Sequence, residues 1–214
     1  MTPREKKQLF SWISSRLVTM AWDTEKTKAL LLDAATAEFS QFGLAGARID
    51  RIAASAGVNK ERIYQYFGKK DELFGIVLAR ELAAVMDAVT MTGTGIEAIT
   101  GYAAQCFDYQ VQNPQLARLI FWEGLERSEP VAEAFRNARS EAKIARLREA
   151  LPGLSHDDAR DLLLTVLALC DSWQVLGLTD RVYTGQRART AARDAERKRR
   201  VVAAVGAIAR DLLA

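Results

Sequence analysis

The sequence IDRIAASAGVNKERIYQYF, residues 49–67, is the most informative part of this chain. Two short segments, 49–56 and 60–67, flank a turn. Gly57 can take the positive φ that a sharp turn between helices requires. Asn59 is a good N-cap for the segment after it. The pattern therefore predicts two short helices that cross at a tight turn.

The second of these helices, residues 60–67, is too rich in Lys, Glu, Arg, Gln and Tyr to serve mainly as core. Its composition is typical of a recognition helix laid in a DNA major groove. Ala53 is small where the helices must cross, and Ile52 and Ile63 provide apolar contacts beneath the crossing. Two helices joined by a glycine turn are also a common packing unit, so the turn alone leaves that alternative open.

Charge is unevenly distributed along the 214 residues. The net charge is only +3, but residues 1–70 hold 12 Lys/Arg against 7 Asp/Glu, a net of +5. The other 144 residues hold 18 against 20, a net of −2. A basic N-terminal third on a slightly acidic body suggests that the N-terminal part faces a polyanion.

The rest of the chain has helical patterns, with prolines at expected helix starts and ends and no long alternation of a strand. We predict an all-α protein with a three-helix helix-turn-helix domain over residues 24–70 and a second helical domain over 71–214. Residues 1–23 form an extension that can also be helical. The expected helices cover residues 24–42, 49–56, 60–67, 70–90, 96–112, 114–127, 130–151, 155–177 and 187–213.

Several classes of protein are not favoured. No apolar run reaches the ~20 residues of a membrane span, and the first residues lack the features of a signal peptide. Cys106 and Cys170 are expected to be buried thiols of a reducing compartment, which favours a cytoplasmic location. The single histidine, His156, lies in an expected helix cap, and no metal-spaced cluster or phosphate-binding loop occurs. We therefore expect no metal, no cofactor and no enzymatic activity.

The stretch from Thr24 to Phe74 closely resembles the DNA-binding domain of the TetR family of bacterial transcriptional regulators. The matching elements are Phe42-Gly43, Ile52-Ala53, Ala56-Gly57-Val58, Tyr64-x-Tyr66-Phe67 and Lys70-x-Glu72-Leu73-Phe74. The resemblance implies a transcriptional repressor that binds double-stranded DNA as a homodimer and is released from a palindromic operator by a small molecule. It also implies that residues 71–214 form the effector-binding and dimerisation domain.

One departure from the family pattern precedes the first of the two short helices. The family usually has two threonines there, one of which caps the helix, and this chain has Ala47 and Arg48. Losing a cap costs about 1 kcal/mol unless another group replaces it. Asp50 offsets part of this loss through the helix dipole, and Arg48 is a candidate for contact with a phosphate.

By the resemblance, the recognition helix contributes base contacts and its flanks contribute phosphate contacts. Arg62 can bind guanine O6 and N7 in a fork, and Gln65 can read adenine. The expected DNA-binding residues are Arg48, Arg51, Lys60, Arg62, Tyr64, Gln65, Tyr66 and Lys70. Within this set, Tyr66 and Lys70 are expected to hold phosphates, and Tyr64 a thymine methyl or a phosphate.

The dimer is expected to form, as in the family, through the last two long helices, residues 155–177 and 187–213. The stripes proposed for that interface are Leu162, Val166, Leu169 and Trp173 on one helix and Val201, Val205, Ile208 and Leu212 on the other. The alternative is that these stripes complete the core of one protomer. A basic run opens the last helix: Arg187, Arg189, Arg193, Arg197, Lys198, Arg199 and Arg200. We interpret it as a solvated helix start in preference to a second nucleic-acid surface.

The C-terminal domain carries most of the large aromatic side chains, and small-molecule sites are mostly apolar with a few placed polar groups. The candidate effector-binding residues are Phe107, Trp122, Glu123, Asp171 and Trp173. Acidic groups among aromatic rings would suit a cationic ligand, so the expected effector is a small hydrophobic or cationic molecule. The same residues could instead be ordinary core.

Three other functions stay open at this point. The chain could be a regulator of the same fold that activates transcription or responds to no ligand. A nonspecific architectural DNA-binding protein is disfavoured by the acidic body, and a helical enzyme would have to rely on carboxylates alone.

Overall fold

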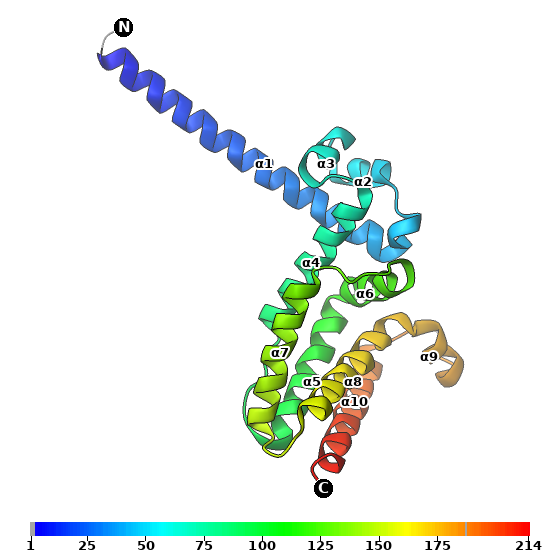
Figure 1. Ribbon diagram of the computed structural model, residues 1–214. Helices are drawn as coiled ribbons and strands as arrows, with labels where there is room; N and C mark the ends of the chain where they lie inside the picture. The colour runs from blue at the N-terminus through cyan, green and yellow to red at the C-terminus, as the bar shows by residue number, and fades with distance from the viewer. Residues whose placement is uncertain (1–2, 187) are drawn as a thin grey trace. The chain divides into compact units, whose positions relative to one another are not determined.

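The computed structural model of the chain describes residues 3–186 and 188–214, with side chains from residue 24 onward. Within these residues all regular secondary structure is helical and no strand occurs, as predicted. The helices are α1 (Pro3–Gly46), α2 (Ile49–Ala56), α3 (Lys60–Phe67), α4 (Lys70–Ala88), α5 (Gly95–Gln112), α6 (Pro114–Glu126), α7 (Glu133–Ala150), α8 (His156–Val175), α9 (Gly177–Thr184) and α10 (Ala191–Asp211) (Figure 1).

The chain divides into two compact units, an N-terminal unit that ends at Val77 and a C-terminal unit that begins at Leu78. The division falls inside α4, whereas the sequence-based limits of 24–70 and 71–214 put it at the start of that helix. Each unit has its own buried core.

The core of the N-terminal unit joins α1, α2, α3 and the beginning of α4. Leu31 and Phe39 from α1, Ile52 from α2, Ile63 from α3 and Phe74 from α4 are all fully buried. The rings of Phe39 and Phe74 meet edge to face with their centroids 5.3 Å apart. This apolar centre holds the two short helices that could not be stable alone.

The first helix differs from the prediction at its start. It begins at Pro3 and includes most of the expected extension, although the side chains of residues 1–23 lie outside those described. Non-helical dihedral angles at Gly43 (φ 69°, ψ −177°) break α1 where the prediction ended the helix, and a short further stretch continues to Gly46. The buried face formed by Leu31, Ala35 and Phe39 is not continued at Phe42. Its ring is exposed and packs under the Arg51 guanidinium, 4.3 Å from the ring centroid.

Three other predictions about the helices were also wrong. α7 begins at Glu133 and not at residue 130, because Ala132 takes a left-handed conformation (φ 51°) and the Val131 N–H donates to a carboxylate of α6. α10 begins at Ala191, capped by the Thr190 side chain. The prediction missed α9, because the glycines that flank this short helix are equally typical of a loop.

The core of the C-terminal unit is built around α5, which packs against α7, α8 and α10. Phe107 on α5, Val166 and Cys170 on α8 and Val205 on α10 meet there. Both cysteines are free and buried, as predicted. Burial raises the pKa of the Cys106 thiol to about 11, which makes it a poor nucleophile at neutral pH.

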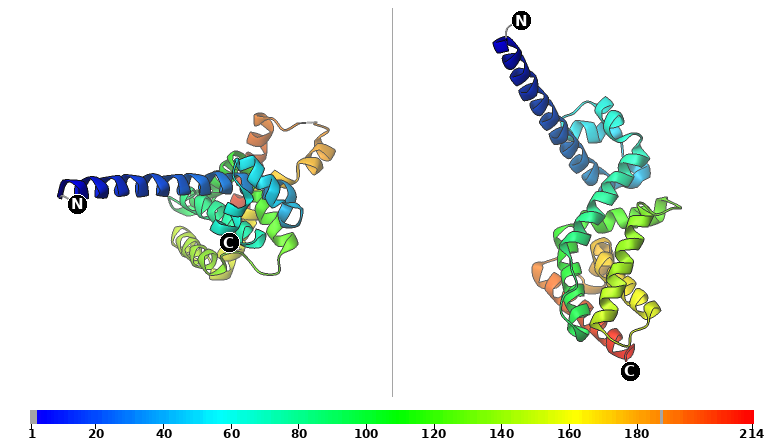
Figure 2. Two further views of the ribbon diagram at one scale, coloured as in Figure 1. Left: turned by 90° about the horizontal axis from the view of Figure 1, so that it is seen from above. Right: turned by 60° about the vertical axis from the view of Figure 1, so that its left-hand side comes forward.

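α9 turns away from α8 by 79°, and the bend is visible in Figure 1 and in the left-hand view of Figure 2. No single helix among the described residues is long and apolar enough to cross a membrane. α8 and α9 meet the length and composition limits only when they are taken together across this bend.

Candidate functional site

The recognition helix α3 has one buried and one exposed face. Ile63 and Phe67 lie in the core, and the intervening positions expose the side chains Lys60, Arg62, Tyr64 and Gln65. The Asn59 side chain accepts the Glu61 N–H at 3.3 Å, and Gly57 has φ 65° in the turn, as the sequence predicted. The cap and the turn therefore fix where the exposed face begins.

Arg62 and Tyr66 form a pair on successive turns of α3. The Arg62 Nη1 donates to the Tyr66 hydroxyl at 2.6 Å, and Lys28 of α1 lies with its Nζ 5.7 Å from the Tyr66 ring centroid. Both Arg62 and Tyr64 remain exposed, with 52% of Tyr64 accessible. The pair places a guanidinium on the outer face of the helix, where an acceptor on DNA could replace the tyrosine hydroxyl.

The missing cap of α2 is replaced in part by a carboxylate from α1. Arg48 makes no side-chain cap, but its N–H donates to the Glu38 Oε1 at 2.8 Å. The Arg51 Nε donates to the same oxygen at 2.8 Å, and its Nη2 donates to the Gly46 carbonyl at 2.9 Å. Arg51 is therefore held in the fold by the buried Glu38, whereas the Arg48 side chain is exposed.

The two lysines assigned to DNA lie in different surroundings. Lys60 is 3.2 Å from the Asp50 carboxylate on the surface, and this partner raises the pKa of Lys60. The Lys70 ammonium donates to the Ala45 and Ala47 carbonyls at 3.3 and 3.2 Å. Lys70 therefore binds the backbone at the end of α1, and Lys60 bridges α3 to the start of α2.

Two of the candidate effector residues, Phe107 on α5 and Trp173 on α8, come together, and a third, Asp171 on α8, contacts α5 through Gln110. The Phe107 and Trp173 rings lie with their centroids 6.5 Å apart. Asp171 is buried and accepts a hydrogen bond from the Gln110 Nε2 at 2.5 Å. Burial raises the pKa of Asp171 to about 6. The Gln110 Oε1 is buried without a hydrogen-bond partner among the described residues, so this group has unused polar capacity.

The other two candidates, Trp122 and Glu123, lie on α6. The buried Glu123 carboxylate accepts the Val131 N–H at 2.6 Å and pairs with the Arg136 Nη1 at 2.8 Å. These contacts join α6 to α7, which accounts for Glu123 without a ligand. Trp122 is half-buried. Across the residues whose side chains are described, no group of three or more His, Cys, Asp or Glu could hold a metal ion.

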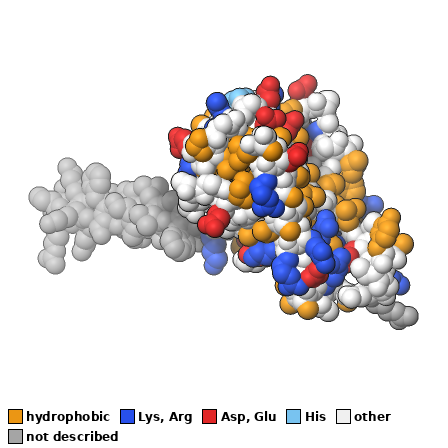
Figure 3. Space-filling model, turned by 90° about the horizontal axis from the view of Figure 1, so that it is seen from below, with side chains coloured by type: hydrophobic (Ala, Val, Ile, Leu, Met, Phe, Trp, Pro, Cys, Tyr) orange, Lys and Arg blue, Asp and Glu red, His pale blue; other side chains and the backbone are white. Residues whose placement is uncertain are grey.

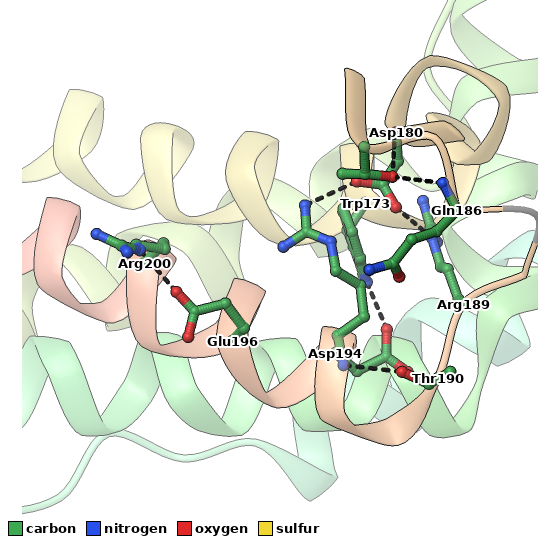
Figure 4. Close-up of polar contacts among 10 residues, drawn as sticks. Trp173, Asp180, Gln186, Arg189, Thr190, Asp194, Glu196 and Arg200 are labelled. Carbon is green, nitrogen blue, oxygen red and sulfur yellow. Dashed lines mark hydrogen bonds and ion pairs between the residues drawn. The ribbon is translucent and has the colours of Figure 1, made fainter. Parts of the chain in front are cut away.

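Sequence reasoning missed what part of the basic run does. Arg189, Arg193 and Arg197 do not form a solvated surface, because their guanidinium groups lie over the Trp173 ring at 3.8, 5.0 and 5.6 Å from its centroid. Figure 4 shows Trp173 and Arg189 of this cluster together with Asp180 and Asp194. The spacing of four residues was the available signal, because residues four positions apart lie on one face of a helix, as Arg193 and Arg197 do on α10. Arg199 and Arg200 are exposed as expected, and Arg187 lies outside the described residues.

The apolar stripes assigned to the dimer interface are mostly part of the protomer's own core. Five of the eight residues proposed for the interface are buried within one chain, so for them the assignment was wrong: Leu162, Val166, Trp173, Val201 and Val205. The physical reason is that α8 and α10 pack on α5 through these faces. Among the predicted stripe residues Ile208 on α10 is exposed, and α8 exposes Leu164 and Leu167, which lie outside the predicted stripe.

Comparison with known proteins matches both units to described families. Residues 31–76 match the family described as bacterial regulatory proteins, tetR family, and residues 98–207 match the tetracyclin repressor-like C-terminal domain. The HTH-type transcriptional repressor SCO4008 of Streptomyces coelicolor is 39% identical over 170 residues, covering 77% of this chain and 87% of the relative. The HTH-type transcriptional repressor NicS of Pseudomonas putida is 31% identical over 111 residues, covering 50% and 52%.

Solved structures show the same fold. The crystal structure of the transcriptional regulator SCO4942 of Streptomyces coelicolor superposes with a TM-score of 0.69 at 30% identity, covering 85% of this chain and 97% of that one. A TetR-like regulator of Rhodococcus sp. RHA1 superposes with a TM-score of 0.58 at 20% identity, covering 86% and 93%.

Proposed function

Because this chain belongs to the TetR family and is a DNA-binding transcriptional regulator, we propose that it represses transcription from a palindromic operator and is released by a small molecule. The observation that carries the proposal is the exposed face of α3. It presents Lys60, Arg62, Tyr64 and Gln65, while the opposite face of the helix packs in the core. Two relatives are named as transcriptional repressors, which supports repression in preference to activation.

In this proposal α3 reads the bases. Arg62 gives up its hydrogen bond to Tyr66 and binds guanine in a fork, while Gln65 binds adenine. Tyr64 contacts a thymine methyl or a phosphate, and Lys60 exchanges Asp50 for DNA. The exchanges made by Arg62 and Gln65 are favourable only at the matching base, so these two residues would provide discrimination. Contacts from Tyr64 or Lys60 to a phosphate would add affinity without discrimination.

Phosphate contacts come from the flanks of the recognition helix in this proposal. The exposed Arg48 side chain at the start of α2 and the Tyr66 hydroxyl on α3 are the best placed groups. Arg51 and Lys70 act mainly by fixing the end of α1 and the start of α2, given their bonds to Glu38 and to backbone carbonyls. These two residues then support DNA binding by positioning the helices.

TetR regulators typically dimerise, and we propose that this chain forms a homodimer through α8 and α10, residues 155–177 and 187–213 in the sequence prediction. The exposed Leu164, Leu167 and Ile208 support this choice, because apolar side chains gathered on helices favour association. Figure 3 shows hydrophobic side chains reaching one face of the molecule in patches. A dimer would present two recognition helices to half-sites about 34–36 Å apart.

TetR regulators typically bind small-molecule effectors, and we propose the region of Phe107, Asp171 and Trp173 for that role. The sequence predicts a small hydrophobic or cationic effector, and of these two a hydrophobic effector is favoured here. Asp171 is buried with a raised pKa, and Trp173 is already covered by guanidinium groups. Release requires that the effector bind the DNA-incompetent arrangement more tightly than the competent one.

We also propose that the chain has no catalytic activity and acts in the cytoplasm. Its membership in a family of transcriptional regulators supports both statements. A regulator that activates is the other candidate, since one relative, FasR of Mycolicibacterium smegmatis, is named an activator at 33% identity over 101 residues.

The experiment that tests the proposal is DNA binding to fragments flanking the chain's own gene, at two salt concentrations and with random DNA as competitor. Tight, competitor-resistant binding to a palindrome is expected, together with a reporter that rises when the gene is deleted. Binding that equals random DNA and falls steeply with salt would contradict the proposal, because only the electrostatic component would remain. A reporter that falls on deletion would identify an activator.

A further inference from the structure

Three arginines in the C-terminal unit lie on one aromatic ring. Arg189 precedes α10, and Arg193 and Arg197 lie on the first turns of that helix. Their guanidinium carbons are 3.8, 5.0 and 5.6 Å from the centroid of the Trp173 ring, and Trp173 itself is almost completely buried. In Figure 4 the Trp173 ring lies among residues of α9 and α10, with its indole nitrogen directed at Asp194.

Most of the nearby acceptors are already in use. Asp194 accepts the Trp173 indole N–H at 2.8 Å. Asp180 accepts from the Arg193 Nη2 at 2.7 Å, but it lies 4.0 Å from the Arg189 Nε, beyond hydrogen-bond reach. The two carboxylates therefore satisfy only part of the donor capacity of the cluster.

Four guanidinium nitrogens in this cluster are buried without a hydrogen-bond partner among the described residues. They are Arg189 Nε, Arg189 Nη2, Arg193 Nε and Arg197 Nε. Buried donors are almost always satisfied in folded proteins, and a group of unsatisfied ones calls for a bound ion, a water or a ligand. An orphan donor on a charged group is especially unfavourable.

The charge balance points to an anion in preference to a neutral partner. Three guanidinium groups face two carboxylates, and burial lowers the pKa of Arg189, as expected for a cation that lacks full compensation. A guanidinium stacked on an indole face keeps its N–H groups directed along its own plane. That geometry fits the paired oxygens of a carboxylate or a phosphate.

We propose that Arg189, Arg193 and Arg197, held on Trp173, form an anion-binding site that takes the carboxylate or phosphate group of a small molecule. The binding is a property of the C-terminal unit by itself. Its consequence for transcription rests on the proposed function, since it names the charged group that an effector would carry. The apolar part of such a molecule would lie toward Phe107, whose ring adjoins Trp173.

The first test is thermal unfolding of the full-length protein with inorganic phosphate as the probe, at constant ionic strength maintained with sodium chloride. The midpoint temperature is expected to rise with phosphate and to saturate, because a ligand that binds only the folded state stabilises it. Arg193→Gln is expected to weaken the apparent affinity roughly tenfold or more, as the loss of a charge-assisted hydrogen bond does.

Arg200→Gln is the matched control. It is the same substitution on the same helix, at an exposed arginine that pairs with Glu196 and does not touch Trp173. It should leave the phosphate effect unchanged. No rise in the wild-type protein, or an equal rise in both variants, would overturn the proposal.

A second variant keeps the test decisive if Arg193→Gln does not fold. Arg197→Lys retains the charge but removes the planar fork. It is expected to fold, as circular dichroism can verify, and to bind phosphate several-fold more weakly, roughly in proportion to the lost hydrogen bonding. Binding equal to that of the wild type would contradict the proposed role of the guanidinium.

Benzoate and benzamide distinguish a carboxylate ligand from simple apolar binding. They share a ring and differ in charge, so only benzoate should raise the midpoint if the anion is recognised. An equal effect of both would overturn the proposal. Operator affinity is then measured with and without benzoate. If benzoate binds without changing operator affinity, the anion site is supported and release by an effector is contradicted. If benzoate releases the operator equally well from the Arg193→Gln variant, only the anion site is contradicted.

Discussion

Arginine meets an aromatic ring in both units of this chain, and the two pairs differ in burial. In the N-terminal unit, Arg62 bonds to the Tyr66 hydroxyl on an exposed helix face, with its guanidinium 5.9 Å from the ring centroid. In the C-terminal unit, Arg189 lies 3.8 Å from the Trp173 centroid and has two buried nitrogens without partners among the described residues. Water can solvate the first guanidinium, but it reaches the second poorly.

The difference shows how one chemistry serves two kinds of recognition. An exposed guanidinium loses little when it changes partners, so it is suited to testing many DNA sites in succession. The guanidinium groups on Trp173 are partly buried, and four of their nitrogens are shielded from water, so an anion that binds there gains hydrogen bonds at a smaller desolvation cost. Burial, and not the type of residue, separates the two roles.

The largest expected effect is on the buried ring. Trp173→Ala should lower the free energy of unfolding of the C-terminal unit by about 3–5 kcal/mol, because it opens a cavity and leaves three guanidinium groups without their stacking surface. Tyr64→Ala, at an exposed ring, should change stability by no more than about 0.5 kcal/mol. Urea unfolding followed by circular dichroism measures the free energy of unfolding of both variants. Similar losses of stability in the two would contradict the difference between the buried and the exposed ring.

A smaller effect is expected at Asp171, the buried carboxyl two residues from Trp173. Its pKa is about 6 in the folded protein, against an ordinary value of 3.8. Because the folded state favours the protonated form, the contribution of Asp171 to stability is full below about pH 4 and is lost as pH rises through about 6. The loss should be on the order of 2–3 kcal/mol.

Asp171→Asn removes this titration and can keep the bond to Gln110. The variant should therefore gain stability over the wild type as pH rises from about 4 to about 7, measured by urea unfolding at each pH. Tyr102, Cys106 and Cys170 also face this region, but burial raises the pKa of each, so they stay neutral over that range. A pH-independent difference between the two proteins would contradict the assignment.

On the exposed side, Arg62→Ala should weaken operator binding by about 1–3 kcal/mol while changing affinity for random DNA much less. Fluorescence anisotropy with labelled operator and unlabelled competitor measures both. Arg51→Ala serves as a comparison, because its bond to Glu38 predicts a loss of stability in the N-terminal unit. If Arg62→Ala weakened both DNAs equally, the base-reading role would be wrong.

The smallest effect is expected at Lys60. Lys60→Ala should reduce the slope of log affinity against log salt by about 1 if the ammonium exchanges Asp50 for a phosphate. The titration is repeated with Lys70→Ala, whose ammonium binds the Ala45 and Ala47 carbonyls. A slope that changes for Lys70 and not for Lys60 would reverse the roles we assign to the two lysines.

Local signals in the sequence were sufficient for the reading head, the helix pair α2 and α3. The limits of these two helices, the left-handed Gly57 and the Asn59 cap were all predicted, because each depends on residues within a few positions of one another. The same holds for the exposed face of α3, since its polar side chains and its buried Ile63 repeat with the helical period. The resemblance to the TetR family rested on these elements too.

Tertiary structure alone decided which charged and aromatic side chains would be buried. Glu38 accepts the Arg48 N–H at the start of α2 from 10 residues away, and three arginines of the basic run pack on the Trp173 ring. The exposed dimer candidates, Leu164 and Leu167, likewise emerge only once α8 has packed its other face on α5. The periodicity of a sequence predicts that a helix has an apolar and a polar face. Which helix packs on the apolar face, and which groups pair with a buried charge, depends on residues distant in sequence.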